Sequence, residues 1–223
     1  MLPVVSLANV YIVFWAKIKY ERVLTLMKNK LINKKRLVIG MSGASGAILG
    51  IEILKALREH PEWESHVVIS RGAELTIAEE TECTLDEVLN LADKVYDIKN
   101  IGASIASGTF KTEGMIIAPC SMKTVAGIAC GYSDNLLLRA ADVTIKETRR
   151  LVLVPRESPL STIHLKNILS LAEAGAIIIP PMITYYNKPL SLEDMNRHII
   201  GKILDKFGIE VSGFNRWGET VFS

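Results

Sequence analysis

The sequence predicts a single three-layer α/β domain with a mostly parallel sheet, and three observations favour this fold class. From residue 36 onward, short apolar runs rich in β-branched residues alternate with longer segments of helical pattern. Those runs are apolar throughout, which is typical of strands that helices cover on both faces. The chain has 223 residues, of which 49% are hydrophobic and 22% are charged, so it can bury one full core.

Six segments have the composition of strands. They are residues 36–41, 66–70, 95–98, 114–118, 151–154 and 176–179. Pro119 and Pro155 follow the fourth and fifth segments and are expected to end them, because proline cannot donate to a sheet ladder. In a parallel sheet of this kind, ligands bind at the carboxyl ends of the strands, so the residues after each strand are the first candidates for a site.

Helical signals lie between and after these strands. They cover residues 45–60, a short segment that begins at the capping box of Thr84 and Glu87, and residues 121–131, 133–148, 161–174 and 191–207. Gly175 and Gly208 follow the last two segments, at the position where glycine commonly closes a helix.

The formal net charge of +2 conceals two parts of opposite sign. Residues 1–36 contain eight Lys or Arg and one acidic residue, whereas residues 37–223 contain 18 basic and 23 acidic residues. We therefore expect residues 1–35 to be an N-terminal extension and residues 36–223 to be the core domain with its C-terminal tail. The mild acidity of that domain argues against nucleic-acid binding, which favours a basic face.

Residues 2–16 form an apolar run that is shorter than the roughly 20 residues needed to cross a bilayer. Its positive charges follow the run, unlike those of a secretory signal. We interpret the extension as a poorly structured segment or the product of an upstream start codon, with Met27 opening the natural domain. A membrane-surface or targeting segment is the alternative.

Three cysteines, Cys83, Cys120 and Cys130, and four histidines show no metal-ligand spacing. An odd number of cysteines without a paired motif predicts a reducing, cytoplasmic location and no metal site. Cys120 follows Pro119 after the fourth predicted strand, and we interpret it as a small buried residue.

The segments after the first two strands carry signals for ligand binding. A glycine-rich stretch, residues 40–50, contains Gly43, Ala44 and Ser45. Glycines let the backbone approach a ligand, and a helix N-terminus offers free amides to a phosphate or carboxylate. The spacing is not GxGxxG and Ser70 rather than an acid ends the second strand, which favours an anion or mononucleotide over NAD. Tight helix–strand packing is the alternative.

The segment after the fourth strand is Ser121, Met122, Lys123 and Thr124. Ser121 and Thr124 either cap the next helix or hydrogen-bond a polar ring edge or a phosphate. Two such segments at consecutive strand ends favour a binding site more than either does alone.

The helix predicted at residues 133–148 places Arg139, Asp142 and Lys146 on one face. This face is either a charged surface exposed to solvent or a cationic binding surface whose side chains the central carboxylate orients.

After the fifth strand, Arg156 and Glu157 lie between two prolines, where a loop without a function would commonly contain Gly, Ser or Asn. We interpret that pair as two rigidly held charges at the carboxyl end of the sheet.

Together these segments resemble the UbiX-type flavin prenyltransferases, also known as phenylacrylic acid decarboxylase-like flavoproteins. The resemblance extends over residues 36–219 and rests on the motifs GMSGASGA (40–47), VVIS (67–70), APCSMKT (118–124), NLLLRAADVTIKE (135–147), LVLVPRESP (151–159), TYYNKP (184–189) and RWGE (216–219). It implies a Rossmann-like, flavodoxin-like flavoprotein that binds FMN. It also implies a homo-oligomer built from trimers, such as a dodecamer.

The resemblance further implies transfer of a dimethylallyl group from dimethylallyl phosphate to N5 and C6 of reduced FMN. The product would be prenylated FMN, the cofactor of UbiD-type decarboxylases, so such a decarboxylase is an expected partner. This chain has no DDxxD-like run of the kind that binds magnesium in metal-dependent prenyltransferases. We therefore expect cationic side chains, and no metal, to stabilise the leaving phosphate.

The resemblance also assigns residues to roles. The residues expected to bind FMN are Gly43, Ala44, Ser45, Ser70, Ser121, Met122, Lys123, Thr124 and Arg139. The residues expected to hold dimethylallyl phosphate are Lys146, Arg156, Glu157, Tyr186, Lys202 and Trp217. Catalytic roles fall to Ser45 and Glu157 in proton transfer and to Lys146 at the phosphate. Lys202 departs from the family, in which many members carry arginine, so a bidentate phosphate contact is lost there.

Three other functions stay open. An FMN-dependent cysteine decarboxylase of the phosphopantothenoylcysteine type shares the fold, but its PASANT-like motif corresponds here to PCSMKT. Direct decarboxylation of a phenylacrylic or other aromatic acid is the second. A non-catalytic flavin carrier is the third, although a carrier would not need cations that expel phosphate, such as Lys146 and Arg156.

Overall fold

The computed structural model describes residues 19–20 and 34–218. The chain divides into two compact units, residues 1–34 and 35–223, and the sheet and its helices belong to the second. The expectations for residues 1–35 fall almost wholly outside the described residues, as does Glu219 of the RWGE motif. Within the described part of the chain, no helix is long and apolar enough to span a membrane.

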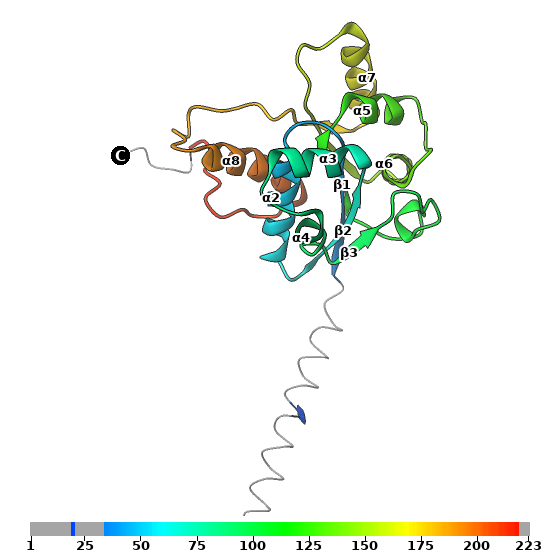
Figure 1. The fold of residues 1–223 in the computed structure, drawn as a ribbon, viewed down its shortest axis with the longest axis horizontal. Coiled ribbons are helices and arrows are strands. Elements are labelled where there is room, and N and C mark those ends of the chain that lie inside the picture. Colours follow the sequence, from blue (N-terminus) through cyan, green and yellow to red (C-terminus); the bar gives the residue numbers. More distant parts are fainter. Residues whose placement is uncertain (1–18, 21–33, 219–223) are drawn as a thin grey trace, which may run out of the picture. The chain divides into compact units, whose positions relative to one another are not determined.

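Six parallel strands form one sheet in the order β3-β2-β1-β4-β5-β6 (Figure 1). Their bounds are β1 Lys35–Met41, β2 Trp63–Ile69, β3 Lys94–Tyr96, β4 Gly114–Cys120, β5 Arg150–Pro155 and β6 Ile177–Ile178. From β1 the chain moves outward to β3 and then returns to β4 on the other side of β1. This reversal makes the carboxyl ends of β1 and β4 the switch point, where open α/β sheets bind ligands.

Helices cover both faces of the sheet, which completes the three predicted layers (Figure 1). One face carries α2 (Ala47–Arg58), α3 (Arg71–Glu80), α4 (Leu85–Leu89) and α8 (Leu192–Leu204). The other carries α5 (Met122–Ala129), α6 (Leu136–Lys146) and α7 (Thr162–Glu173). In β1, Leu37 and Ile39 pack with the first set and Val38 with the second, because successive strand side chains point to opposite faces.

The six predicted strands are confirmed, and β5 ends at Pro155 as predicted, but the prediction that Pro119 ends β4 is wrong. β4 continues through Pro119 to Cys120, and β5 includes Pro155. The pairing of these strands shifts register after Ile117 and resumes where Cys120 opposes Pro155. Irregularities of this kind are where sheets accept proline, because no regular ladder hydrogen bond is lost there. Both prolines therefore lie at the edge of the sheet that carries the site.

The sequence analysis did not predict α3. Of its ten residues only Ala73 and Ile77 are buried, so the segment shows little apolar periodicity. Its start has a clear physical cause, because the Ser70 hydroxyl accepts the Ala73 N–H at 3.2 Å. The predicted capping box of α4 is confirmed.

Two predicted helix starts were wrong by two or three residues. The helix α2 begins at Ala47 rather than residue 45, since Gly46 has a φ of +108°, outside the helical region. The helix α6 begins at Leu136 rather than residue 133, where the Asn135 side chain accepts the Leu138 N–H. The 3₁₀ helices Ser104–Ala106 and Asp205–Phe207 complete the described elements of the domain.

Candidate active site

A buried serine joins the carboxyl ends of β1 and β4. Ser42 Oγ accepts the Ser121 N–H at 2.8 Å and donates to the Pro119 carbonyl at 3.2 Å. The Ser42 N–H donates to that same carbonyl at 3.1 Å. The two segments that follow adjacent strands at the switch point are therefore held side by side.

The N-terminus of α5 lies at this junction. The Ser121 hydroxyl accepts the Thr124 N–H at 3.3 Å and lies 3.1 Å from the Thr124 hydroxyl, so Ser121 caps the helix, which is one of the two interpretations of this segment, and Thr124 does not. Met122 is buried and Lys123 is exposed. Because a helix leaves its first N–H groups without intrahelical partners, this terminus suits an anion or a polar ring edge.

The loop after β1 packs directly on the first turn of α3. A Cβ on Gly43 would lie 2.8 Å from the Cα of Gly72, so neither backbone leaves room for a side chain. The Ser70 N–H donates to the Met41 carbonyl at 2.9 Å. Ala44, the residue after Gly43, is buried. The fold thus brings the predicted residues Gly43, Ala44 and Ser70 to one edge of the sheet.

Glu80, the last residue of α3, belongs to this edge and was missed by the sequence analysis. Its Oε2 accepts the N–H groups of Gly46 at 2.8 Å and Ala47 at 3.1 Å, a cap that Gly46 itself cannot supply. Burial acts to raise the pKa of Glu80, but these bonds, the Ser45 hydroxyl and Arg156 together lower it from its usual value. A charged carboxylate is therefore held at the N-terminus of α2, beside a predicted catalytic residue.

Arg156 and Glu157 begin the loop after β5. The Arg156 N–H donates to the Cys120 carbonyl at 3.2 Å, which ties this loop to the end of β4. The Arg156 charge is one of the causes that lower the pKa of Glu80. Glu157 is exposed, and its Oε1 accepts the Ser158 N–H at 3.0 Å. The two residues lie at the carboxyl end of β5 as expected, and their role as a rigid charged pair stays a prediction.

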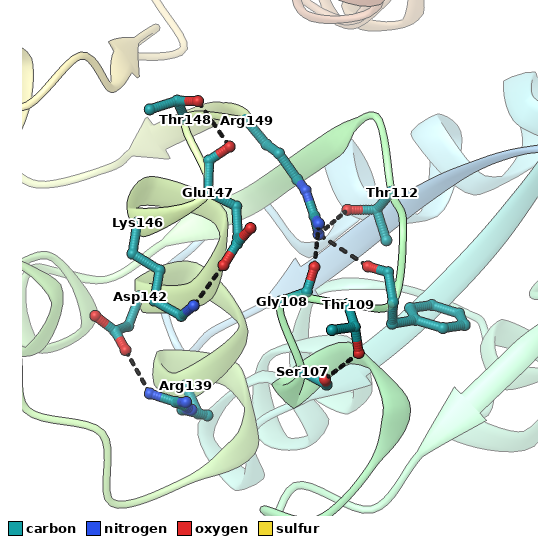
Figure 2. A network of polar contacts seen from close by, with 11 residues as sticks. Ser107, Gly108, Thr109, Thr112, Arg139, Asp142, Lys146, Glu147, Thr148 and Arg149 are labelled. Atoms are coloured by element: carbon teal, nitrogen blue, oxygen red, sulfur yellow. Dashed lines mark hydrogen bonds and ion pairs between the residues drawn. The ribbon is translucent and has the colours of Figure 1, made fainter.

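Arg139 and Lys146 lie on α6, and each faces a carboxylate (Figure 2). Arg139 Nη1 lies 2.7 Å from Asp142 Oδ2, and Lys146 Nζ lies 2.5 Å from Glu147 Oε1. The Lys146 ammonium lowers the pKa of Glu147. The expected role of Asp142 is therefore corrected in one respect: it orients Arg139, whereas Glu147 orients Lys146.

The loop that precedes β4 packs against the Lys146–Glu147 pair (Figure 2). Arg149 donates to the carbonyls of Gly108 and Phe110, at 2.5 Å and 2.9 Å. A Cβ on Gly108 would collide with the Glu147 carboxylate and lie 3.0 Å from Lys146 Nζ. The absence of a side chain at Gly108 is thus a condition for the Lys146–Glu147 pair to lie where it does.

Tyr186, Lys202 and Trp217 belong to a separate group. The Tyr186 hydroxyl lies 3.2 Å from His198 Nε2 on α8, and its ring meets the Trp217 ring edge-on at 5.2 Å. Lys202 is exposed on α8, one turn beyond His198. Because α8 and α6 pack on opposite faces of the sheet, the described part of one chain does not bring this group together with the cations of α6 (Figure 1).

Cys120 is fully buried, and burial raises the pKa of its thiol, so it has the character of a packing residue rather than a nucleophile. Among residues 19–20 and 34–218, no group of three or more His, Cys, Asp or Glu side chains is arranged to hold a metal ion.

Comparison with known proteins identifies the family. Residues 26–205 match the family model described as Flavoprotein. The chain is 55% identical over 185 residues to a probable UbiX-like flavin prenyltransferase of Sedimentibacter hydroxybenzoicus, an alignment that covers 83% of this chain and 98% of the relative. This chain belongs to the UbiX-like flavin prenyltransferases.

Solved structures of UbiX-like proteins share the fold of this flavin prenyltransferase. The structure of AnUbiX (PadA1) in complex with FMN and dimethylallyl pyrophosphate has a TM-score of 0.82 and 46% identity, covering 85% of this chain and 100% of that one. A dodecameric FMN-dependent UbiX-like decarboxylase from Escherichia coli O157:H7 has a TM-score of 0.81 and 50% identity, covering 82% and 98%. The predicted family and α/β flavoprotein fold are confirmed, and both of these solved relatives are FMN proteins, in agreement with the expected cofactor. The roles given to individual residues stay predictions.

Proposed function

We propose that this chain transfers a dimethylallyl group from dimethylallyl phosphate to N5 and C6 of reduced FMN, and that the product serves a UbiD-type decarboxylase. One observation carries the proposal: a glycine-lined loop, the N-terminus of α5 and the backbone of Arg156 meet at the β1–β4 switch point. A relative of the same fold is solved with FMN and dimethylallyl pyrophosphate, which supports both ligand classes.

The residues at the switch point fit FMN. The backbone contact between Gly43 and Gly72 fixes this loop against α3 without an intervening side chain, so the loop is held in place for a ligand. Ser121 and Thr124 offer hydroxyl groups at the α5 terminus, where a polar ring edge or a phosphate can bind. When bound, reduced FMN supplies the nucleophilic N5 and C6 positions.

The cations are proposed to act on the donor's phosphate. The allylic C–O bond breaks and its electron pair leaves with the phosphate, so Lys146, Arg156, Lys202 and the Tyr186 hydroxyl stabilise that charge without a metal. Trp217, whose ring meets Tyr186, would close the site and stabilise the allylic cation over its face.

Ser45 and Glu157 are proposed to move protons. Glu157 is exposed and accepts one backbone hydrogen bond, which leaves carboxylate lone pairs for the proton lost from C6. Glu80 joins this set because it accepts the N–H groups of Gly46 and Ala47, directly after Ser45, and the Ser45 hydroxyl is among the groups that lower its pKa. It would fix the Ser45 hydroxyl in one orientation.

The separation of the cations across the sheet supports an oligomer in which neighbouring chains complete each site. We propose a homo-oligomer built from trimers, and a structural relative is dodecameric. Residues 36–223 are proposed to carry this function in the cytoplasm, with no catalytic part for residues 1–35.

Anaerobic incubation with reduced FMN and dimethylallyl phosphate tests the proposal, with dimethylallyl diphosphate in parallel. We expect a flavin heavier by one isoprenyl unit on mass spectrometry. An unchanged flavin mass with folded, FMN-loaded protein would refute the transferase activity. Glu157→Gln should slow turnover while FMN still binds, whereas Glu173→Gln on the exposed end of α7 should change neither.

A further inference from the structure

A buried histidine that the proposed function does not use lies behind Tyr186. His198 is 3% exposed, and its Nε2 lies 3.2 Å from the Tyr186 hydroxyl. The two rings meet edge-on, with centroids 5.4 Å apart. Within the described residues, the other ring nitrogen, Nδ1, is buried and has no hydrogen-bond partner. Only the tyrosine side of this imidazole therefore makes a polar contact.

The protonation of His198 follows from this asymmetry. Burial, and then the nearby Lys202 charge, lower the pKa of His198, so the ring is neutral at neutral pH. A neutral imidazole carries its proton on one nitrogen only. A proton on Nδ1 would create a buried donor without an acceptor, the kind of orphan that folded proteins rarely contain. A proton on Nε2 leaves only an unused lone pair and gives the Tyr186 oxygen a donor.

The direction of the tyrosine proton follows in turn. If His198 Nε2–H donates to the Tyr186 oxygen, the hydroxyl proton is free to point to another acceptor. Tyr186 is 38% exposed, so that acceptor can be a bound ligand. The hydroxyl then acts as a donor, the role that an anionic phosphate requires.

We propose that His198 is a positioning residue that fixes the Tyr186 hydroxyl as a hydrogen-bond donor to the phosphate of the prenyl donor. The proposal rests on the proposed function, in which Tyr186 contacts that phosphate. Packing alone does not explain a histidine at this position. Its ring lies between the rings of Tyr186 and Phe214, where phenylalanine would pack without a buried unpartnered nitrogen.

The tautomer is tested directly and without activity. Solid-state ¹⁵N NMR of protein labelled at histidine distinguishes protonated from unprotonated ring nitrogens, and His198→Phe identifies the His198 signals. We expect a protonated Nε2 and an unprotonated Nδ1 at neutral pH. A protonated Nδ1 would overturn the proposal whether or not the protein is a prenyltransferase.

A double-mutant cycle tests the functional part, with kcat/KM for dimethylallyl phosphate as the measurement. Tyr186→Phe and His198→Phe should each lower kcat/KM by about tenfold, and His198→Phe should add less than about twofold in the Tyr186→Phe background. His198→Gln retains an N–H donor and should restore part of the loss. His164→Gln, at a distant capping histidine, is the matched control and should leave kcat/KM unchanged.

The outcomes separate the two proposals. Independent, multiplying effects of His198→Phe and Tyr186→Phe would show that His198 acts by packing, and the positioning role would fail while the transferase activity stands. No effect of Tyr186→Phe would remove Tyr186 from the phosphate site and overturn the positioning role with it. Absence of prenylated flavin from the unsubstituted protein is the separate failure of the proposed function.

Discussion

The hydroxyl of Ser42 offers the sharpest test of how the switch point is held together. Ser42→Ala removes the acceptor of the Ser121 N–H and the donor to the Pro119 carbonyl. These losses are unequal, because the Pro119 carbonyl still accepts the Ser42 N–H at 3.1 Å. The cost therefore comes mainly from the Ser121 N–H, which is only partly buried, and the loss of its hydrogen bond costs about 0.5–1.5 kcal/mol.

We expect Ser42→Ala to lower the free energy of unfolding by about that amount, or about 2–4 °C in Tm per kcal/mol for a chain of this size. Urea unfolding followed by tryptophan fluorescence measures it, with an unchanged m-value as the sign that only stability has changed. Ser170→Ala, on an exposed position of α7, is the control and should stay within about 0.5 kcal/mol. Equal stability of the two variants would refute the role of Ser42 as the link between β1 and β4.

Two further substitutions test neighbouring contacts. Gly43→Ala would place its Cβ 2.8 Å from the Gly72 backbone, so we expect FMN affinity to fall by about tenfold in calorimetric titration. Gly102→Ala, whose nearest contact is 3.6 Å, should bind FMN normally, and equal affinities would contradict the close packing. Glu80 has a lowered pKa, so its contribution to stability is present above its ordinary value of 4.5 and is lost as pH falls through the folded value. In urea unfolding from about pH 3 to pH 7, Glu80→Gln should therefore flatten the acid side of the profile, and parallel profiles would show that Glu80 does not cap α2.

The parts of the fold that could be predicted are those in which each residue carries its own signal. Strands buried on both faces are apolar throughout, and Ser121 could be recognised as a cap from its place before a helix. The helix α3 has no such signal, because only Ala73 and Ile77 contact the core. Glu80 was missed for the same reason, since it reaches the N-terminus of α2 only when α3 folds over that loop.

The pairing of Lys146 with Glu147 was hidden for a different reason. Adjacent residues in a helix do not face one another, so sequence spacing pointed to Asp142 as the partner. Lys146 is the last residue of α6 and Glu147 caps it, so regular helical geometry has ended at this pair. The contact between Tyr186 and His198 could not be predicted from the sequence either. Tyr186 lies in an irregular loop before α8, so no regular spacing relates it to His198.

The carboxylates of α6 also bear on how an acidic domain presents cations to an anion. The side chain of Arg139 is 38% exposed and that of Lys146 is 46% exposed. Ion pairs at such exposed positions contribute only about 0–1 kcal/mol to stability. Hydrogen bonds from a cation to a phosphate contribute more, about 1.5–3 kcal/mol each. If Arg139 and Lys146 bind phosphate as proposed, the phosphate can therefore displace Asp142 or Glu147 at small cost. Without a ligand, Asp142 and Glu147 would balance the positive charges of Arg139 and Lys146. With an anion bound, those charges would face the anion instead. The net charge of +2 over the whole chain does not indicate such a local arrangement.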